Sequence, residues 1–195
     1  MNKLLLITIL LLPIPGFAGI YTNPVNIRPY AGLNTGLNIA DYTIKTDIDE
    51  QYYSATINAG ARIGTNFGLE FFFTHSGNNN IELTSTLETI NHEVYYIGYG
   101  FDIYAYHRIT HNFNFFTTFG VANYNFYDKY DYINTFDSTS DKISENSINT
   151  RLGIGFMFTF PGENVSALFR YQYIPTDLEI IRNLNEFSLG IRYTF

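Results

Sequence analysis

The chain has 195 residues, a formal net charge of -7 and 18% aromatic residues, all of them Tyr or Phe. This acidic balance, without any Lys/Arg cluster, argues against a nucleic-acid-binding protein, and the length suits one domain. With no Cys, the chain has no disulfide framework, thiolate metal site or lipoprotein anchor.

The N-terminus predicts a secretory signal peptide. Lys3 supplies a charged start, Leu4–Leu12 is a short apolar run, and the small residues Gly16 and Ala18 precede a cleavage site before Gly19. The apolar run is too short for a transmembrane helix, which needs roughly 20 residues. We therefore predict a cleaved signal peptide at residues 1–18 and one domain at residues 19–195. No long apolar stretch remains after the signal, so any membrane span must consist of strands.

Apolar and polar residues then alternate in a series of short segments, which predicts strands with one apolar and one polar face. Small residues such as Gly32, Gly60 and Gly98 fall on the polar face, as a narrow barrel interior requires. The predicted strands are Arg28–Ile39, Tyr53–Gly64, Gly68–Thr74, Tyr95–Ile103, Phe115–Tyr124, Ile148–Phe158, Val165–Gln172 and Phe187–Phe195.

The connections between these strands differ in length on the two sides. Short turns at 65–67, 105–112 and 160–164 alternate with longer polar segments, an asymmetry typical of outer-membrane barrels. A hairpin centred on Asn66 would pair Arg62 directly with Glu70 as favourable cross-strand neighbours. We expect outer loops at Asp41–Glu50, His75–Asn91, Asn125–Ser147 and Ile174–Asn185.

The last strand decides between the candidate fold classes. Its apolar face carries Leu189, Ile191, Tyr193 and Phe195, and a soluble sheet would gain nothing by ending on an exposed Phe. We therefore predict an all-β fold, an eight-stranded antiparallel up-and-down transmembrane β-barrel. The rival is a soluble β-sandwich or lipocalin-like barrel, with apolar residues inside. A ten-stranded barrel that uses Ile81–Ile90 is a further alternative.

Three motifs carry a resemblance to a known family: Arg-Pro-Tyr-Ala-Gly-Leu-Asn-Thr-Gly-Leu at Arg28–Leu37, Asn-Phe-Gly-Leu-Glu at Asn66–Glu70, and Gly-Ile-Arg-Tyr-Thr-Phe at Gly190–Phe195. Over its whole mature length the chain resembles the small outer-membrane β-barrels that include the OmpA transmembrane domain, opacity-type adhesins and OmpX/Ail proteins. The resemblance implies contact with outer-membrane lipids and lipopolysaccharide. It also implies that Tyr193 and Phe195 form an assembly signal for the outer-membrane assembly machinery.

Six charged residues fall on the inward faces, and two interpretations are open. They could line a channel or bind an anion, or they could fill the lumen as ion pairs, because about eight strands leave space only for side chains. We favour the filled lumen, and the resemblance implies the same kind of plug. These six residues are four arginines and two acids. Water, Tyr hydroxyls or Glu186 must then accommodate the positive charge that the two acids leave unpaired. The six residues are Arg62, Glu70, Asp102, Arg151, Arg170 and Arg192.

Evidence for catalysis or metal binding is weak. His75-Ser76 and His92-Glu93 lie near the expected outer rim, where some small barrels act on lipid A, but nothing fixes their geometry. The four His and the Asp-rich loops lack metal-ligand spacing, and the acidic Asn125–Ser147 loop is better explained as a solvated face than as a calcium site. We predict no catalytic, cofactor or metal site.

The leading hypothesis is a non-enzymatic protein of the bacterial outer membrane. Its expected role is structural or adhesin-like, with the outer loops contacting a host or surface ligand. A narrow passive channel is the second hypothesis, and a lipid-modifying enzyme is the third.

Overall fold

The computed structural model describes residues 26–43, 50–84, 88–134, 138–162, 164–176 and 181–195. The expected signal peptide therefore lies outside the described residues. Across those ranges the chain forms nine β-segments: β1 (Ile27–Tyr42), β2 (Gln51–Ile63), β3 (Phe67–Ser76), β4 (Asn79–Thr84), β5 (Glu88–Arg108), β6 (Phe113–Asn134), β7 (Ser138–Thr159), β8 (Val165–Pro175) and β9 (Ile181–Thr194).

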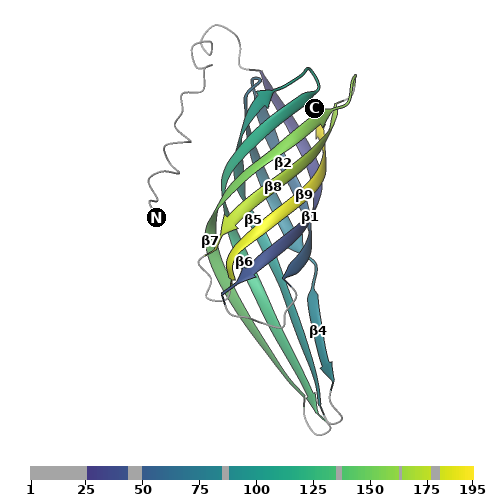
Figure 1. Ribbon diagram of the computed structural model, residues 1–195, viewed down its shortest axis with the longest axis vertical. Coiled ribbons are helices and arrows are strands. Elements are labelled where there is room, and N and C mark those ends of the chain that lie inside the picture. The colour runs from purple at the N-terminus through teal and green to yellow at the C-terminus, as the bar shows by residue number, and fades with distance from the viewer. Residues whose placement is uncertain (1–25, 44–49, 85–87, 135–137, 163, 177–180) are drawn as a thin grey trace.

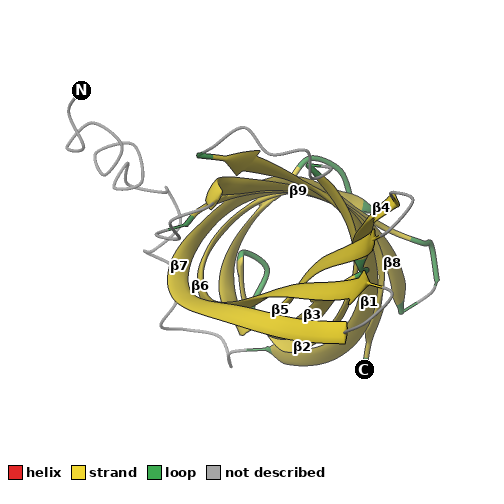
Figure 2. Cartoon of the chain, turned by 90° about the horizontal axis from the view of Figure 1, so that it is seen from below, coloured by secondary structure: helices red, strands yellow, loops and turns green. Residues whose placement is uncertain are grey.

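These segments close into a single antiparallel barrel (Figures 1 and 2). Apart from β3 and β4, which do not pair with each other, segments that follow one another in sequence are paired, and β1 pairs with β9 to close the ring. After a break at residues 77–78, β4 continues the path of β3, and both pair with β5. The described residues therefore make an eight-stranded barrel, which confirms the predicted fold class, and the ten-stranded alternative is wrong.

The barrel is apolar on the outside and polar in the lumen. Leu33, Ile57 and Phe71 are 65%, 58% and 60% exposed on the outer face, whereas Thr56 and Glu70, which point inward, are buried. This arrangement follows from strict alternation, since successive side chains of a strand point to opposite faces. It contradicts the soluble sandwich, which would bury the apolar face. In the described part of the chain no helix is long and apolar enough to cross a membrane.

The two ends of the barrel differ (Figure 1). One end, here called the turn end, carries the short connections 64–66, 109–112 and 160–164 together with the end of β9. Gly64 and Gly162 have φ values of 64° and 72°, a left-handed conformation that side chains disfavour, so glycine suits both turns. The other end, here called the hairpin end, carries the long extensions of β5, β6 and β7.

The register of the first hairpin differs from the sequence prediction. Its loop is residues 64–66 and its closing pair is Ile63 with Phe67, so Glu70 faces Gly60 and Arg62 faces Gly68. The expected direct pairing of Arg62 with Glu70 is therefore wrong. The left-handed conformation of Gly64 ends β2 one residue earlier than a hairpin centred on Asn66 requires.

Several expected outer loops contain strands. The Asn125–Ser147 segment is mostly the hairpin of β6 and β7, whose ladder continues as far as the pair Ile133–Ser138. Likewise, the His75–Asn91 segment contains β4 and the start of β5, as expected for arms that extend a hairpin. In the Ile174–Asn185 segment, Ile174, Ile181 and Leu184 are buried in the lumen rather than solvated in a loop. Residues 44–49 of the Asp41–Glu50 loop lie outside the described residues.

Candidate functional site: the lumen and the protruding sheet

Three arginines and three carboxylates meet in the middle of the lumen, and we call them the lumen network. The arginines come from β7, β8 and β9, and the carboxylates come from β3, β5 and β9, so the network joins opposite walls of the barrel. None of the six side chains is more than 4% exposed. The formal charges within the network cancel. The members are Arg151, Arg170, Arg192, Glu70, Asp102 and Glu186.

Glu70 binds the most partners on the turn-end side of the network. Its Oε2 is 2.6 Å from Nη2 of Arg192, and its Oε1 is 3.3 Å from Nη1 of Arg170. The hydroxyl of Tyr104 donates a hydrogen bond to Oε1 at 2.8 Å and accepts one from Arg170 at 2.7 Å. The Arg192 guanidinium also lies over the Tyr30 ring, 3.8 Å from its centroid. This carboxylate therefore depends on two cations and one hydroxyl for its stability in the lumen.

Asp102 and Glu186 both bind Arg151 and Arg170, so Arg170 contacts all three carboxylates. Asp102 Oδ1 lies 3.6 Å from Nε of Arg151, and Glu186 contacts both Arg151 and Arg170 at 3.6 and 3.7 Å. Gln172 links the two partners, because it donates to Asp102 at 3.2 Å and accepts a hydrogen bond from Arg151. Glu186 thus supplies the third carboxylate, which balances the three arginines of the network.

Arg62, the sixth residue expected among the lumen charges, lies apart from the others. Its guanidinium donates to the Thr65 carbonyl at 2.6 Å and to Asn114 Oδ1 at 3.5 Å, and it lies 4.5 Å from the Tyr106 ring centroid. No carboxylate of the described residues pairs with it. The structure therefore brings five of the six predicted residues together and leaves Arg62 near the turn end.

Aromatic clusters lie on either side of the network. Tyr52, Tyr96 and Tyr124 belong to a buried cluster toward the hairpin end, and Tyr104 and Phe116 belong to a second cluster toward the turn end. The arginines contact both, since Arg151 stacks on Phe72 of the first cluster and Arg192 approaches Tyr104 of the second. The lumen is therefore filled in three layers, aromatic, charged and aromatic.

At the hairpin end, β4 to β7 form a sheet that extends past the rest of the barrel, and we call it the protruding sheet (Figure 1). Strand β7 pairs with β6 from Ser138 onward, but its ladder with β8 begins only at Leu152. Among the described residues, the side of β7 from Ser138 to Arg151 that faces away from β6 therefore has no strand neighbour. Such an edge presents unpaired backbone N–H and C=O groups.

The His75-Ser76 pair does not form a catalytic dyad. His75 is exposed on the outer face and stacks on Tyr95, with ring centroids 5.9 Å apart. Ser76 is buried on the opposite face, where its Oγ accepts a hydrogen bond from the Tyr96 backbone N–H at 2.7 Å. Successive strand residues point to opposite faces, so these two groups cannot act on one substrate atom.

The other expectations for site residues are placed as follows. Tyr193 and Phe195 are 47% and 70% exposed on the outer face, with ring centroids 5.2 Å apart, and their role as an assembly signal stays a prediction. The side chain of His92 lies outside the described residues. Over the ranges that the structure covers, no group of three or more His, Asp or Glu residues is arranged to hold a metal ion.

Comparisons with known proteins agree with this architecture. The family described as outer membrane protein beta-barrel domain matches residues 5–195. Neisserial surface protein A superposes with a TM-score of 0.60 at 15% identity, over 86% of this chain and 97% of that one. Ail of Yersinia pestis, solved in complex with the heparin analogue sucrose octasulfate, gives a TM-score of 0.56 at 16% identity, over 89% and 100%. A major outer membrane protein of Thermus thermophilus superposes with a TM-score of 0.58 at 10% identity, over 86% of this chain and 99% of that one. No curated protein sequence matches the chain.

Proposed function

The chain belongs to the outer membrane protein β-barrel domain family and is an integral protein of the bacterial outer membrane; we propose that it acts there as a surface-interaction protein through its protruding sheet. In barrels of this kind the short turns face the periplasm and the longer connections face the outside. The turn end is then periplasmic and the hairpin end extracellular. The protruding sheet would stand above the membrane surface, where a partner can reach it.

The open edge of β7 is the observation that carries this proposal. A partner segment in extended conformation can add to such an edge as a further strand, with main-chain hydrogen bonds for affinity and side-chain contacts for specificity. The edge runs from Ser138 to Arg151, longer than a typical strand of 5–6 residues. Lys142, whose ammonium lies 4.4 Å from the Tyr127 ring centroid, and Glu145 place charges along it. Charges on an edge strand disfavour indiscriminate pairing, so the edge favours a partner of complementary sequence.

The charge of the outer segments indicates which partners are disfavoured. The four expected outer segments, Asp41–Glu50, His75–Asn91, Asn125–Ser147 and Ile174–Asn185, contain thirteen Asp or Glu residues and four Lys or Arg residues. A polyanion would be repelled by this surface. Ail was solved with a heparin analogue, but for this chain we propose a protein partner that offers an extended strand, with neutral or basic side chains.

Shortening the protruding sheet tests the proposal. Residues Asp128–Ile143 are replaced by Asn-Gly, which joins the directly paired Tyr127 and Ser144 through a two-residue turn. We expect cells that display this variant to lose most of their binding to host cells or matrix proteins, because the outermost six of the fourteen open-edge residues, Ser138–Ile143, are removed. Binding is measured with fluorescent cells at matched surface amounts of the protein. Undiminished binding by the shortened variant would contradict the proposal.

A matched control separates the edge from the sheet as a whole. The double variant Asp131→Asn and Lys129→Gln removes an exposed ion pair of β6, whose Nζ–Oδ2 distance is 2.7 Å, and leaves the β7 edge intact. Binding by this variant should stay close to that of the unaltered protein, since exposed ion pairs contribute little. Loss of binding in the control as well would assign the interaction to surface charge and not to the β7 edge.

The layered lumen supports the proposal that the barrel does not conduct. Purified protein in planar bilayers should show no conductance steps above background, because the buried network and both aromatic clusters fill the interior. Regular steps from the unaltered protein would favour the channel instead.

We also propose that the protein is not an enzyme, since the His75-Ser76 pair points to two faces. Unchanged lipid A in a host that expresses the protein is the expected result, and a modified species would contradict it. Contacts with lipopolysaccharide and the assembly machinery stay predictions from the apolar outer face and the aromatic end of β9.

A further inference from the structure

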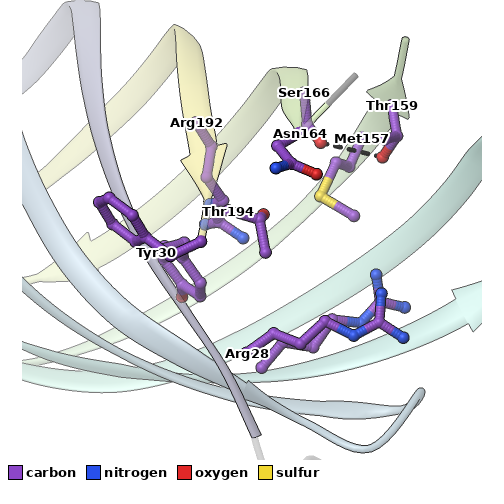
Figure 3. A pocket seen from close by; sticks show the side chains of 10 residues that line it. Arg28, Tyr30, Met157, Thr159, Asn164, Ser166, Arg192 and Thr194 are labelled. Carbon is purple, nitrogen blue, oxygen red and sulfur yellow. Dashed lines mark hydrogen bonds between the residues drawn. The ribbon is translucent and has the colours of Figure 1, made fainter. Parts of the chain in front are cut away.

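At the turn end, the mouth of the lumen holds a cavity of about 150 Å³ that contains three arginines (Figure 3). Arg28, Arg62 and Arg192 line it, together with the hydroxyl groups of Thr159, Ser166 and Thr194. Its volume is several times the roughly 30 Å³ that one water molecule occupies in the liquid. No described Asp or Glu lines it. The cavity is therefore polar and positively charged, whereas the lumen network, farther toward the hairpin end, is neutral.

The backbone register places two of these charges side by side. Arg28 of β1 and Arg62 of β2 are direct cross-strand partners, and both side chains line the same cavity. Like charges directly opposite each other on a sheet are destabilising. Within the described residues Arg62 binds neutral oxygen atoms and an aromatic ring, and no carboxylate. An anion between the two guanidiniums would turn this repulsion into attraction.

The third arginine differs from the other two. Arg192 is 4% exposed, and its Nη1 and Nη2 atoms donate to Tyr106 at 2.7 Å and to Glu70 at 2.6 Å. Its Nε has no hydrogen-bond partner among the described residues. This Nε is shielded from the cavity and the charge of Arg192 is paired with Glu70, so the excess positive charge of the cavity comes from Arg28 and Arg62.

The remaining lining groups suit an oxyanion. Ser166 and Thr159 both line the cavity and share a hydrogen bond of 2.9 Å (Figure 3). Guanidinium groups match the geometry of phosphate oxygens and bind them through charge-assisted hydrogen bonds. We propose that this cavity binds a phosphate group at the periplasmic mouth of the barrel. The phosphate comes from free phosphate or from the headgroup of an inner-leaflet phospholipid, and the site is independent of the surface interaction proposed above.

Calorimetric titration tests the site on the full chain, purified from bacterial outer membranes into phosphate-free octyl glucoside micelles. Inorganic phosphate should bind saturably to the unaltered protein. Arg28→Gln and Arg62→Gln should each weaken that binding by roughly tenfold, since each removes a charge-assisted bond. The matched control is Arg108→Gln, an exposed arginine of the same end that does not line the cavity, and it should change affinity by less than about twofold.

A second variant keeps the test decisive if an Arg→Gln change disturbs folding. Arg28→Glu places opposite charges on the Arg28–Arg62 register pair. It should abolish phosphate binding while it keeps or raises the unfolding midpoint relative to Arg28→Gln. Phosphate binding that survives in Arg28→Glu would overturn the proposal.

The source of the phosphate is distinguished by competition. If short-chain phosphatidylglycerol displaces phosphate at a lower concentration than glycerol phosphate does, the ligand is the lipid headgroup; equal displacement assigns the site to free phosphate. Absence of phosphate binding in the unaltered protein overturns the proposal. Glu163 precedes Asn164 of the cavity rim in the sequence and lies outside the described residues. If phosphate binds only to the Glu163→Gln variant, the chain's own carboxylate occupies the cavity in the unaltered protein, and this result also overturns the proposal.

Discussion

Replacing Glu70 with Gln is expected to lower the free energy of unfolding by about 3–5 kcal/mol, because removing one partner of a buried ion pair leaves an uncompensated charge. Glu70 contacts Arg192 at 2.6 Å and Arg170 at 3.3 Å and accepts a hydrogen bond from Tyr104. After the substitution, three buried arginines would face two carboxylates. The neutral amide cannot offset the third charge, although it has nearly the shape of the carboxylate.

The measurement is urea unfolding of the protein folded in lipid vesicles, followed by the shift of the band on unboiled gels. Glu93→Gln is the matched control, because Glu93 is partly exposed, outside the lumen network, and bonded to Asn78; its effect should stay below about 1 kcal/mol. The double variant Glu70→Gln with Arg192→Gln should cost less than the sum of its single changes, since the two residues interact directly. Equal effects of Glu70→Gln and Glu93→Gln would show that the network contributes nothing.

Gly100→Ala has the second largest expected effect, a loss of about 1–3 kcal/mol of unfolding free energy. A Cβ atom on Gly100 would lie 2.6 Å from the Cα of Ala122 and closer still to the carbonyl oxygen of Val121. Both obstacles are backbone atoms of β6, the strand paired with β5 at this point. No side-chain rotation can relieve the clash, so the two strands must separate locally. This cost exceeds the roughly 0.5–1 kcal/mol that Ala otherwise gains over Gly within a strand.

Gly77→Ala is the control for the glycine prediction. Its added Cβ would meet only the Tyr53 carbonyl oxygen, at an ordinary contact distance of 3.5 Å. Unfolding of this variant in the same vesicles should differ from the unaltered protein by no more than about 0.5 kcal/mol. A stable Gly100→Ala variant with an unchanged unfolding midpoint would mean that β5 and β6 are packed less closely here than the structure has them.

The strands that cross the membrane were predictable because the two faces of each strand meet different environments. Lipid on one side and a packed polar lumen on the other impose alternation, so the inward or outward direction of Leu33, Thr56 and Ile191 follows directly from the sequence. The extensions of β6 and β7 lack this signal. Water contacts both faces of these extensions above the membrane. The sequence of Asn125–Ser147 therefore predicted a loop, although most of the segment forms strands.

The candidate site was only partly predictable, for two physical reasons. Alternation predicts that Glu70 and Arg170 point inward, but only the closed barrel brings them together, since they lie on strands that are not neighbours. Register is set by turn geometry, and the left-handed Gly64 moves the partner of Glu70 from Arg62 to Gly60. The role of Glu186 as the third carboxylate likewise depends on where β9 lies beside β8.

The division of charge between early and late strands has a consequence for the order of assembly. Glu70 and Asp102 lie on β3 and β5, whereas the three arginines lie on β7, β8 and β9. A sheet that has not yet curled and sealed β1 against β9 keeps Glu70 of β3 away from Arg170 and Arg192, so these contacts form only when the barrel closes. Glu186 of β9 can meet Arg170 of the adjacent β8 before that step. Water must leave the lumen at the same moment, because the charges cannot lose their hydration before their partners arrive. The unsealed sheet is therefore a hydrated ribbon whose charges are only partly paired, and closing the seam completes the network that holds opposite walls of the barrel together.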